Sequence, residues 1–385
     1  MKVQFGSLYF LIFSLAVSSC TIDLSQPSAI TPVAQVETVP SATSSSLPEG
    51  QATQQSTNIL PSFPTTTIPV TWAALNLSGK LVYTSAVFQT QSLSQSILIE
   101  IRSLDLTTGT VTTIFQTPNG GWVDAVAVSP DNKQLAICYF PPVGAPYASQ
   151  KSLYGMPLDG STFPQILFTP PLPEDNYSQP AWSPDGKYIY FTHFKNQSAI
   201  FDVWRMPYSN GKLEKLADNA SWPRVSEDGT RLVYVWIDSG TRLNRLYVAN
   251  ADGSDAHIIP LTGPYIPKII DAPMFSADGQ SIIFSAPSPT QSSVPGFFLI
   301  GLDIKQVLRN GAVPSDWWSV PLAGGEPNRL TNIQALALFG NFSPDKKHIA
   351  VFNADGIFVM TPDGSGLTSV IDDVGQIYGT VSWIP

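Results

Sequence analysis

The segment Trp182–Thr192, WSPDGKYIYFT, carries the pattern that decides the fold of this chain. It opens with a Ser-Pro-Asp-Gly turn signal, in which proline presets φ, aspartate accepts hydrogen bonds from the following backbone, and glycine takes a positive φ. An alternating aromatic and β-branched run follows, and a period of two is typical of a β-strand. The segment therefore predicts a tight turn that leads from one extended stretch into an antiparallel strand.

The same pattern recurs along the chain, each time as Ser-x-Asp before a β-branched and aromatic run. The other copies are VSPDNKQLAICY at Val128–Tyr139, VSEDGTRLVYVW at Val225–Trp236, FSADGQSIIFSA at Phe275–Ala286 and FSPDKKHIAVFN at Phe342–Asn353. A further strand and a second glycine-containing turn follow each copy, as at Val203–Pro207 (VWRMP). Such recurrence predicts a repeat architecture, and four short antiparallel strands per repeat make one blade of a β-propeller.

The two ends of the repeat region predict how the ring closes. Leu75–Ser85 begins a blade that lacks the Pro-Asp turn, and Ile97–Phe115 supplies later strands of that blade. The final residues, Gly379–Pro385, match Gln179–Pro184 when the two segments are aligned on Trp383 and its counterpart. We therefore expect an all-β, six-bladed propeller with four antiparallel strands per blade, closed by the C-terminal strand pairing into the first blade.

Proline marks the innermost strand of several repeats. Pro180, Pro223 and Pro273 occupy one aligned position before the turn. Because proline cannot donate a hydrogen bond to a β-ladder, it belongs on an edge strand. We therefore expect these strands to be the blade edges that face the central channel.

The repeats WSPDG at Trp182–Gly186, FSADG at Phe275–Gly279 and FSPDK at Phe342–Lys346 resemble the WD40-like Pro-Asp repeats of TolB-type six-bladed propellers. The resemblance covers the chain from about Trp72 to Pro385. The resemblance is specific for the fold but says little about the function. The family includes periplasmic scaffold proteins, propeller domains of peptidases and some carbohydrate-active enzymes.

The N-terminus resembles that of a bacterial lipoprotein. Lys2 precedes an apolar segment, Phe5–Val17, which is too short to span a bilayer as a helix. The sequence VSSC at residues 17–20 is similar to a lipobox. The resemblance implies a signal peptide at 1–19 and a lipid anchor on Cys20, whereas the alternative is an ordinary secretory signal that ends near a cysteine.

Residues 20–70 are dominated by Ser, Thr, Pro, Gln and Ala and contain no Lys or Arg. Such a segment cannot bury enough apolar surface to offset its ordering entropy, so we expect a disordered tether. A flexible coil of this length has a root-mean-square reach of about 40 Å. The predicted organisation is therefore an extracytoplasmic propeller at 71–385 that is held to the cell membrane by the lipid on Cys20.

The composition argues against two classes of partner. The formal net charge is −9, and no basic stripe is present. We therefore expect neither nucleic-acid binding nor electrostatic docking on anionic lipid. Cys138, the only cysteine besides Cys20, lies in an apolar strand and is interpreted as a buried structural thiol.

Catalytic motifs are sparse. The chain lacks a Gly-x-Ser-x-Gly elbow, and its three histidines (His193, His257 and His348) do not have metal-site spacing, so we expect no metal and no cofactor. Asp124 and Asp271 align at the start of two innermost strands. Two carboxylates that meet over the channel could process a carbohydrate or peptide, and this enzymatic alternative stays open.

The connections between strands point to a binding role instead. Short Asp-Gly turns fall on one predicted face, whereas long Pro- and aromatic-rich loops fall on the other, and long loops are uncommon unless functional or disordered. We therefore favour a non-enzymatic binding module or scaffold at the cell envelope, with a protein, peptide or glycan partner. The predicted contact residues are Tyr177, Trp222, Tyr265 and Phe297.

Overall fold

The computed structural model describes residues 63, 65–91, 94–148, 150–170, 175–195, 200–209, 211–241, 243–289, 313–336, 338–375 and 379–385. The chain divides into two compact units, Met1–Ser56 and Thr57–Pro385, and every described residue belongs to the second. Cys20 and Phe297 therefore lie outside the described residues, together with the predicted signal peptide and most of the predicted tether.

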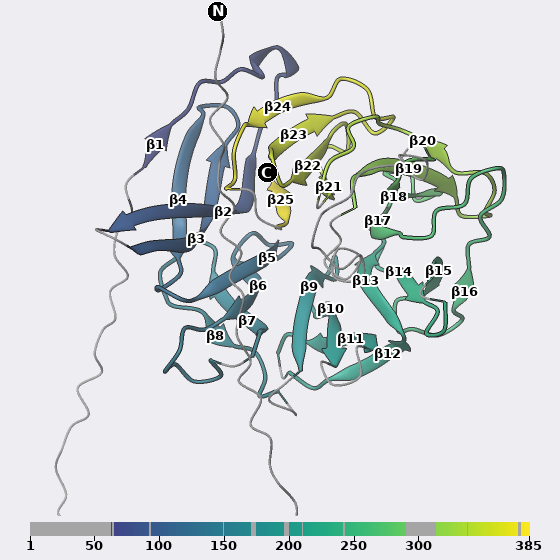
Figure 1. Cartoon of the computed structure of the whole chain (residues 1–385), viewed down its shortest axis with the longest axis horizontal. Coiled ribbons are helices and arrows are strands. Elements are labelled where there is room, and N and C mark those ends of the chain that lie inside the picture. Colours follow the sequence, from purple (N-terminus) through teal and green to yellow (C-terminus); the bar gives the residue numbers. More distant parts are fainter. Residues whose placement is uncertain are drawn as a thin grey trace, which may run out of the picture. The chain divides into compact units, whose positions relative to one another are not determined.

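The second unit consists of six antiparallel sheets arranged as a ring of blades (Figure 1). From the innermost strand outward, blade 1 contains β5 (Trp122–Val128), β6 (Gln134–Phe140), β7 (Ser152–Pro157) and β8 (Gln165–Ile166); blade 2 contains β9 (Asn176–Trp182), β10 (Tyr188–Lys195), β11 (Ile200–Pro207) and β12 (Glu214–Asp218); and blade 3 contains β13 (Ala220–Val225), β14 (Arg231–Ile237), β15 (Asn244–Asn250) and β16 (His257–Ile258). Blade 4 contains β17 (Asp271–Phe275), β18 (Ser281–Pro287), β19 (Ser315–Pro321) and β20 (Asn328–Arg329); blade 5 contains β21 (Phe339–Phe342), β22 (Ile349–Asn353), β23 (Gly356–Met360) and β24 (Thr368–Ile371); and blade 6 contains β25 (Val381–Ile384), β2 (Lys80–Gln91), β3 (Ser94–Asp105), β4 (Thr110–Gln116) and β1 (Thr66–Thr67).

This arrangement confirms the predicted all-β, six-bladed propeller. Each innermost strand contacts the next one around the ring, so that β5, β9, β13, β17, β21 and β25 surround the central axis. The only helix among the described residues is a short 3₁₀ turn, Ala73–Leu75. Thr66–Thr67 adds a fifth strand to the outer edge of blade 6, so the compact unit begins upstream of the predicted boundary at residue 71.

Closure by the C-terminal strand is also confirmed. β25 pairs antiparallel with β2, from Lys80 opposite Ile384 to Tyr83 opposite Val381. The hydroxyl of Thr380 then links blade 6 to blade 1, because it accepts a hydrogen bond from the Val126 N–H (2.7 Å) and donates one to the Val126 carbonyl (2.8 Å). The ring is therefore joined by strands from opposite ends of the unit.

The recurring Ser-x-Asp motif forms the same hydrogen-bonded turn in blades 1 to 5. In each turn the serine hydroxyl donates to the aspartate Oδ1 at 2.5–2.7 Å and accepts the backbone N–H five residues after the serine. The aspartate Oδ1 also accepts the backbone N–H two residues after itself. The aspartates thus accept hydrogen bonds within their own turns, as predicted from the sequence.

The aligned prolines lie on innermost edge strands, as predicted. The residues before them, Gln179, Trp222 and Ala272, have φ values of 56°, 59° and 45°, and the strand register shifts at each position. These are β-bulges with a left-handed residue, which bend an edge strand and re-aim its side chains. The bulges occur where the strands border the channel.

The apolar core lies between neighbouring blades, where alternate side chains of facing sheets meet. Trp317 and Phe191 are among the largest side chains that are fully buried. Cys138 is buried in blade 1, and burial raises the pKa of its thiol well above the usual value. This position matches that of a structural thiol.

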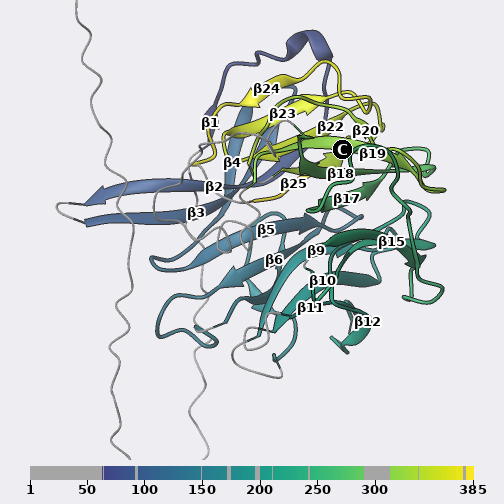
Figure 2. The ribbon, with the colours of Figure 1, turned by 45° about the vertical axis from the view of Figure 1, so that its right-hand side comes forward.

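Blade 6 carries a hairpin that is longer than its counterparts. β2 and β3 have 12 residues each, whereas the corresponding strands of the other blades have 5 to 8. Figure 2 shows this hairpin projecting beyond the neighbouring blades. Phe88 and Ile97 form a cross-strand pair on it.

Candidate binding face and channel

The connections of the ring fall on two faces with different character. Turns that join first to second and third to fourth strands lie on one face, which we call the turn face. Connections from second to third strands and between blades lie on the opposite face, which we call the loop face. The projecting end of the β2–β3 hairpin belongs to the loop face.

Exposed apolar side chains gather on the loop face. Eight large apolar side chains of the described residues are exposed, and two of them, Ile258 on β16 and Leu367 before β24, lie elsewhere. The other six form what we call the apolar loop-face set, which consists of Phe88 (59% exposed), Ile97 (42%), Val143 (97%), Tyr147 (38%), Ile266 (45%) and Leu336 (37%). None of the six was among the predicted contact residues, although four lie in connections between strands.

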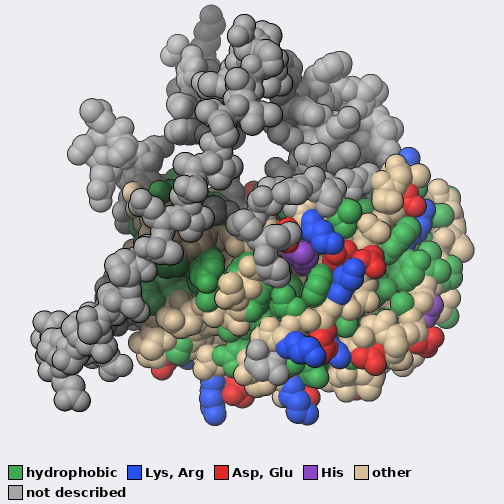
Figure 3. Space-filling view, turned by 90° about the horizontal axis from the view of Figure 1, so that it is seen from below, with side chains coloured by type: hydrophobic (Ala, Val, Ile, Leu, Met, Phe, Trp, Pro, Cys, Tyr) green, Lys and Arg blue, Asp and Glu red, His purple; other side chains and the backbone are tan. Residues whose placement is uncertain are grey.

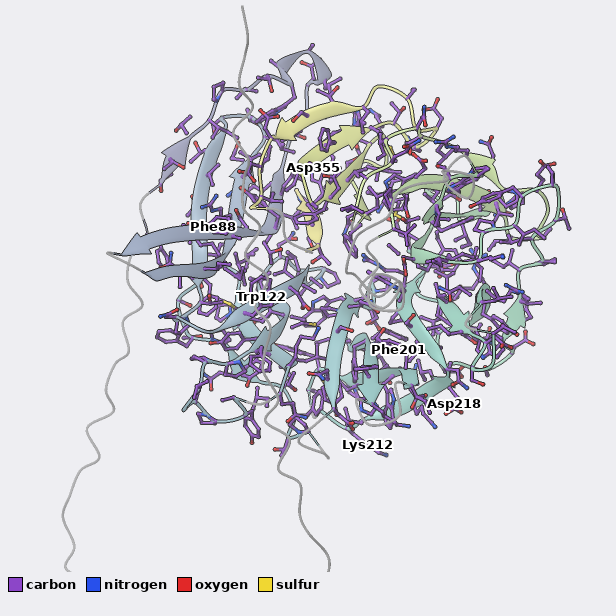
Figure 4. All side chains as sticks on the ribbon, in the orientation of Figure 1. Phe88, Trp122, Phe201, Lys212, Asp218 and Asp355 are labelled. Atoms are coloured by element: carbon purple, nitrogen blue, oxygen red, sulfur yellow. The ribbon has the colours of Figure 1, made fainter. Side chains whose placement is uncertain are left out.

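A cavity of about 430 Å³ adjoins this set between the β2–β3 hairpin and blade 5. Phe88, Asp355, Asp372, Asp373 and Gly375 line it, and Figure 4 labels Phe88 on β2 and Asp355 in blade 5. The Asp373 carboxylate accepts the Gly375 N–H at 2.6 Å, which orders the loop that follows β24. An exposed ring and three carboxylates therefore border one hollow of the loop face.

Two of the predicted contact residues, Tyr177 and Tyr265, are packed or hydrogen-bonded within the protein. Tyr177 is only 2% exposed, and its ring stacks on His193 with the ring centres 4.9 Å apart. The expectation that Tyr177 lies on an accessible loop is therefore wrong, because the residue belongs to β9 and packs between blades 1 and 2. Tyr265 is partly buried, and its hydroxyl donates to the Pro287 carbonyl at 2.6 Å.

Trp222 lies at the channel instead of in a loop. Its indole N–H donates to the Asp271 carboxylate at 3.0 Å, which joins blade 3 to blade 4. Burial raises the pKa of Asp271 to about 6, although the hydrogen bond from Trp222 opposes the increase. This combination of a channel carboxylate and a shifted pKa is typical of a functional position, but also of a structural pair.

Asp124 and Asp271 lie three blades apart in the ring of six, and each has its own partner. Asp124 accepts an ion pair from Lys151 at 2.6 Å. Burial alone would lower the pKa of Lys151. The attraction of the Asp124 carboxylate opposes this effect, and the net pKa lies above the usual value of a lysine. Lys151 therefore neutralises Asp124, one carboxylate of the alternative catalytic pair. Asp124 and Asp271 are not hydrogen-bonded to each other.

The histidines have separate environments. His193 is buried and its Nε2 lies 2.8 Å from the Asp175 carboxylate, whereas His257 is exposed on β16 and His348 lies on blade 5 near Trp383. Among the residues that the structure describes, no group of three or more His, Cys, Asp or Glu side chains could hold a metal ion.

Charged side chains on the outer rim are mixed in sign. Figure 3 shows Lys and Arg beside Asp and Glu there, with apolar and neutral side chains between them. Blade 2 provides examples, because Arg205 pairs with Glu214 at 2.8 Å and Lys215 with Asp218 at 2.5 Å. The viewed part of the rim therefore carries charges of both signs.

Comparison with solved structures supports the architecture. TolB from Acinetobacter baumannii superimposes with a TM-score of 0.51 at 17% identity, covering 79% of this chain and 66% of that one. Putative TolB from Agrobacterium tumefaciens gives 0.52 at 17% identity, covering 80% and 99%. This chain has a TolB-like propeller fold.

The TolB-like fold is also shared more widely. A chain of the nidogen/laminin complex superimposes with a TM-score of 0.51 at 12% identity, covering 78% of this chain and 97% of that one. No protein-family model and no curated protein matches the sequence. Within the described part of this TolB-like propeller, no helix is long and apolar enough to cross a membrane.

Proposed function

We propose that this TolB-like propeller is a binding module or scaffold whose loop face holds a protein partner outside the cytoplasm, at the cell envelope. The observation that carries the proposal is the apolar loop-face set, six of the eight exposed large apolar side chains of the described residues. Single exposed apolar side chains occur on any protein, whereas a gathering on one face is typical of an interaction site.

The chemistry of this set favours a protein over a glycan. Four of its members, Ile97, Val143, Ile266 and Leu336, are aliphatic. Sugar rings are usually held by aromatic stacking together with polar groups, whereas aliphatic side chains pack against other apolar side chains. The three carboxylates beside Phe88 would add selectivity for basic groups at the margin of the contact.

The binding proposal is tested by crosslinking and affinity recovery from intact membranes. Phe88→Ala with Ile97→Ala, and separately Ile266→Ala, should reduce recovery of the partner at least tenfold, which corresponds to about 1.4 kcal/mol of binding free energy. Ile258→Ala and Leu367→Ala are matched controls, because these side chains are similarly exposed off the loop face. Equal losses in the controls and in the loop-face variants would contradict the proposal.

We also propose that a lipid on Cys20 anchors the protein to the outer surface of a cell membrane and that residues 20–70 act as its tether. The sequence VSSC at residues 17–20 supports this, together with the Ser/Thr/Pro-rich segment that follows. Cys20→Ser should abolish incorporation of a labelled fatty acid and release the protein from membranes. Cys138→Ala should retain both properties, and labelling that survives Cys20→Ser would exclude the anchor.

A carbohydrate- or peptide-processing enzyme is the second candidate function, and the raised pKa of Asp271 at the channel favours it. In that case Asp271→Asn would remove turnover of a carbohydrate or peptide substrate but leave binding at the loop face intact. Partner recovery that depends on Asp124 or Asp271, and not on the apolar loop-face set, would support this second function.

A further inference from the structure

A single arginine reaches across the channel. Arg224 lies on β13, the innermost strand of blade 3, and its guanidinium carbon lies 4.3 Å from the centre of the Phe339 ring on β21. Blades 3 and 5 are not neighbours in the ring, because blade 4 stands between them. The contact therefore joins the innermost strands of two blades that are not adjacent, and Arg224 keeps partial exposure.

Arg224 differs from the other described arginines in its hydrogen bonding. Each of the others donates to a protein acceptor: Arg102 to Glu100, Arg205 to Glu214, Arg231 to Gly279, Arg245 to Asn244 and Arg329 to Asp316. Arg224 makes no hydrogen bond or ion pair with any described residue, and its guanidinium instead makes a cation–π contact with the Phe339 ring. Its five N–H groups are donors only, so they are available to water or to a ligand that carries acceptors.

The charge of Arg224 favours an anionic ligand at this position. Burial lowers the pKa of Arg224 to about 10, so the guanidinium is still charged at neutral pH. Stacking on one aromatic ring returns only about 0.5–2 kcal/mol. An anion beside the partly exposed guanidinium would add a charge-assisted hydrogen bond that no described residue provides.

The walls around this guanidinium are held in place. The Trp222 ring lies 6.4 Å from the Phe339 ring. The Trp222 backbone N–H donates to the Gln179 Oε1 (3.1 Å) and to the Thr192 Oγ1 (3.0 Å), and its indole N–H donates to Asp271. Hydrogen bonds from the two neighbouring blades, 2 and 4, therefore fix the bulge that carries Trp222 two residues before Arg224. The aromatic wall and its one cation are thus pre-organised.

We propose that the channel is a binding site for a small molecule or chain terminus that carries a carboxylate, with Arg224 as the group that binds the anion. A planar carboxylate accepts two parallel hydrogen bonds from a guanidinium, which an aromatic stack leaves free at its edge. Trp222, which is only partly buried, supplies an apolar surface for the remainder of the ligand, and the buried Phe339 ring holds the guanidinium from behind. The site does not depend on the proposed loop-face function.

Benzoate is the probe that matches an arginine beside aromatic walls, and benzamide is its uncharged counterpart. Titrations of the purified full-length chain in detergent should show saturable binding of benzoate, with benzamide at least tenfold weaker. Arg224→Gln should weaken benzoate binding at least tenfold, and Arg224→Lys should restore part of it. Acetate and inorganic phosphate, as further arms, show whether the aromatic surface and the planar anion are both required.

The matched control is Arg231→Gln. Arg231 also stacks on an aromatic ring, with its guanidinium carbon 5.1 Å from the centre of Phe275, but it already donates to the Gly279 carbonyl. Benzoate binding should be unchanged in this variant. Equal binding of benzamide and benzoate, equal losses in the Arg224 and Arg231 variants, or no saturable benzoate binding would overturn the proposal.

A second measurement keeps the proposal testable if Arg224→Gln does not fold. In the unsubstituted protein, benzoate should shift the indole N–H resonance of Trp222, one of nine tryptophans, assigned by its loss in Trp222→Phe. A benzoate titration that moves other indole resonances and leaves that of Trp222 in place would contradict binding at this site.

Discussion

At the scale of single residues, the Ser-x-Asp turns show how one local interaction is used repeatedly. In blade 2, the Ser183 hydroxyl donates to Asp185 and accepts the Tyr188 N–H. The Ser183 hydroxyl is the main cause of a pKa near 2 for Asp185, with the Lys187 N–H as the next contribution. Since the folded pKa lies below the unfolded value, this carboxylate stabilises the fold above about pH 4, and the contribution is lost as the pH falls toward 2.

We therefore predict that Ser183→Ala lowers the free energy of unfolding at pH 7 by about 1–2 kcal/mol, because it leaves the Tyr188 N–H without its acceptor. The difference from the unsubstituted protein should shrink between pH 4 and pH 2, where Asp185 protonates in both. Urea unfolding at several pH values measures this. Ser209→Ala is the control, since Ser209 is exposed and its side chain makes no hydrogen bond with another described residue. A constant difference across the pH range would show that Asp185 is not coupled to Ser183.

The pKa of Asp271 is shifted in the opposite direction to that of Asp185. Burial raises the pKa of its carboxyl from 3.8 to about 6, so the folded state holds its proton more tightly than the unfolded chain does. Stability from this group is therefore greatest below about pH 4 and decreases as the pH rises through 6. At about 1.4 kcal/mol per pH unit, ionised Asp271 costs the fold at most about 3 kcal/mol at neutral pH.

Asp271→Asn should accordingly raise the free energy of unfolding at pH 7.5 by about 1–3 kcal/mol, since the amide oxygen can still accept the Trp222 indole N–H. The gain should vanish near pH 4. Denaturant titrations at both pH values check this, with Asp218→Asn on the exposed rim as the control that should show no gain. An Asp271→Asn protein that is less stable at pH 7.5 would mean that the charge itself is required.

At the scale of elements, the strand that closes the ring has the largest consequence. β25 covers the edge of β2 and joins blade 1 through Thr380 and Val126. An uncovered β2 would present a row of unpaired backbone groups, which promotes association between chains.

Deletion of residues 379–385 should therefore abolish cooperative thermal unfolding or cause aggregation, as measured by circular dichroism and light scattering. Deletion of Pro385 alone is the control, because this residue is exposed and follows the last residue of β25. If the protein without these seven residues melts like the full chain, closure by β25 is dispensable, and the pairing of β25 with β2 contributes little to the stability.

The elements also show what could be predicted from sequence. Turns, innermost prolines and the closing strand were predictable because each copy repeats the same local pattern, as at Trp182 and Trp383. The length of the β2–β3 hairpin was not, because its tip is rich in Ser and Gln and resembles a loop. Tyr177 was misplaced for a related reason: it follows a proline-rich connection but already belongs to β9.

The candidate sites were harder to predict than the strands. The side chains of Trp222 and Arg224 meet Phe339 only after three blades have assembled, so no local pattern indicates that contact. Their role depends on a β-bulge that re-aims the innermost strand. The exposed ends of loops, such as Val143 and Ile266, likewise become a common face only in the closed ring.

At the scale of the whole molecule, the two faces of the propeller differ in structure and in the role that we propose for them. The turn face is built from repeated, internally hydrogen-bonded turns. The loop face carries the projecting hairpin and, among the described residues, most of the large apolar side chains that are exposed. A rigid ring that presents variable connections on one side is a common basis for recognition. The central claim is therefore that partners contact the loop face.

Site-specific photocrosslinking in living cells tests this claim most directly. A photoreactive amino acid would replace Phe88, Tyr147 or Ile266 on the loop face and, as controls, Ile258 or Leu367 elsewhere. We predict that the three loop-face positions yield one common crosslinked protein and that the two control positions do not. Crosslinks to the same protein from Ile258 or Leu367, with none from the loop face, would contradict the account.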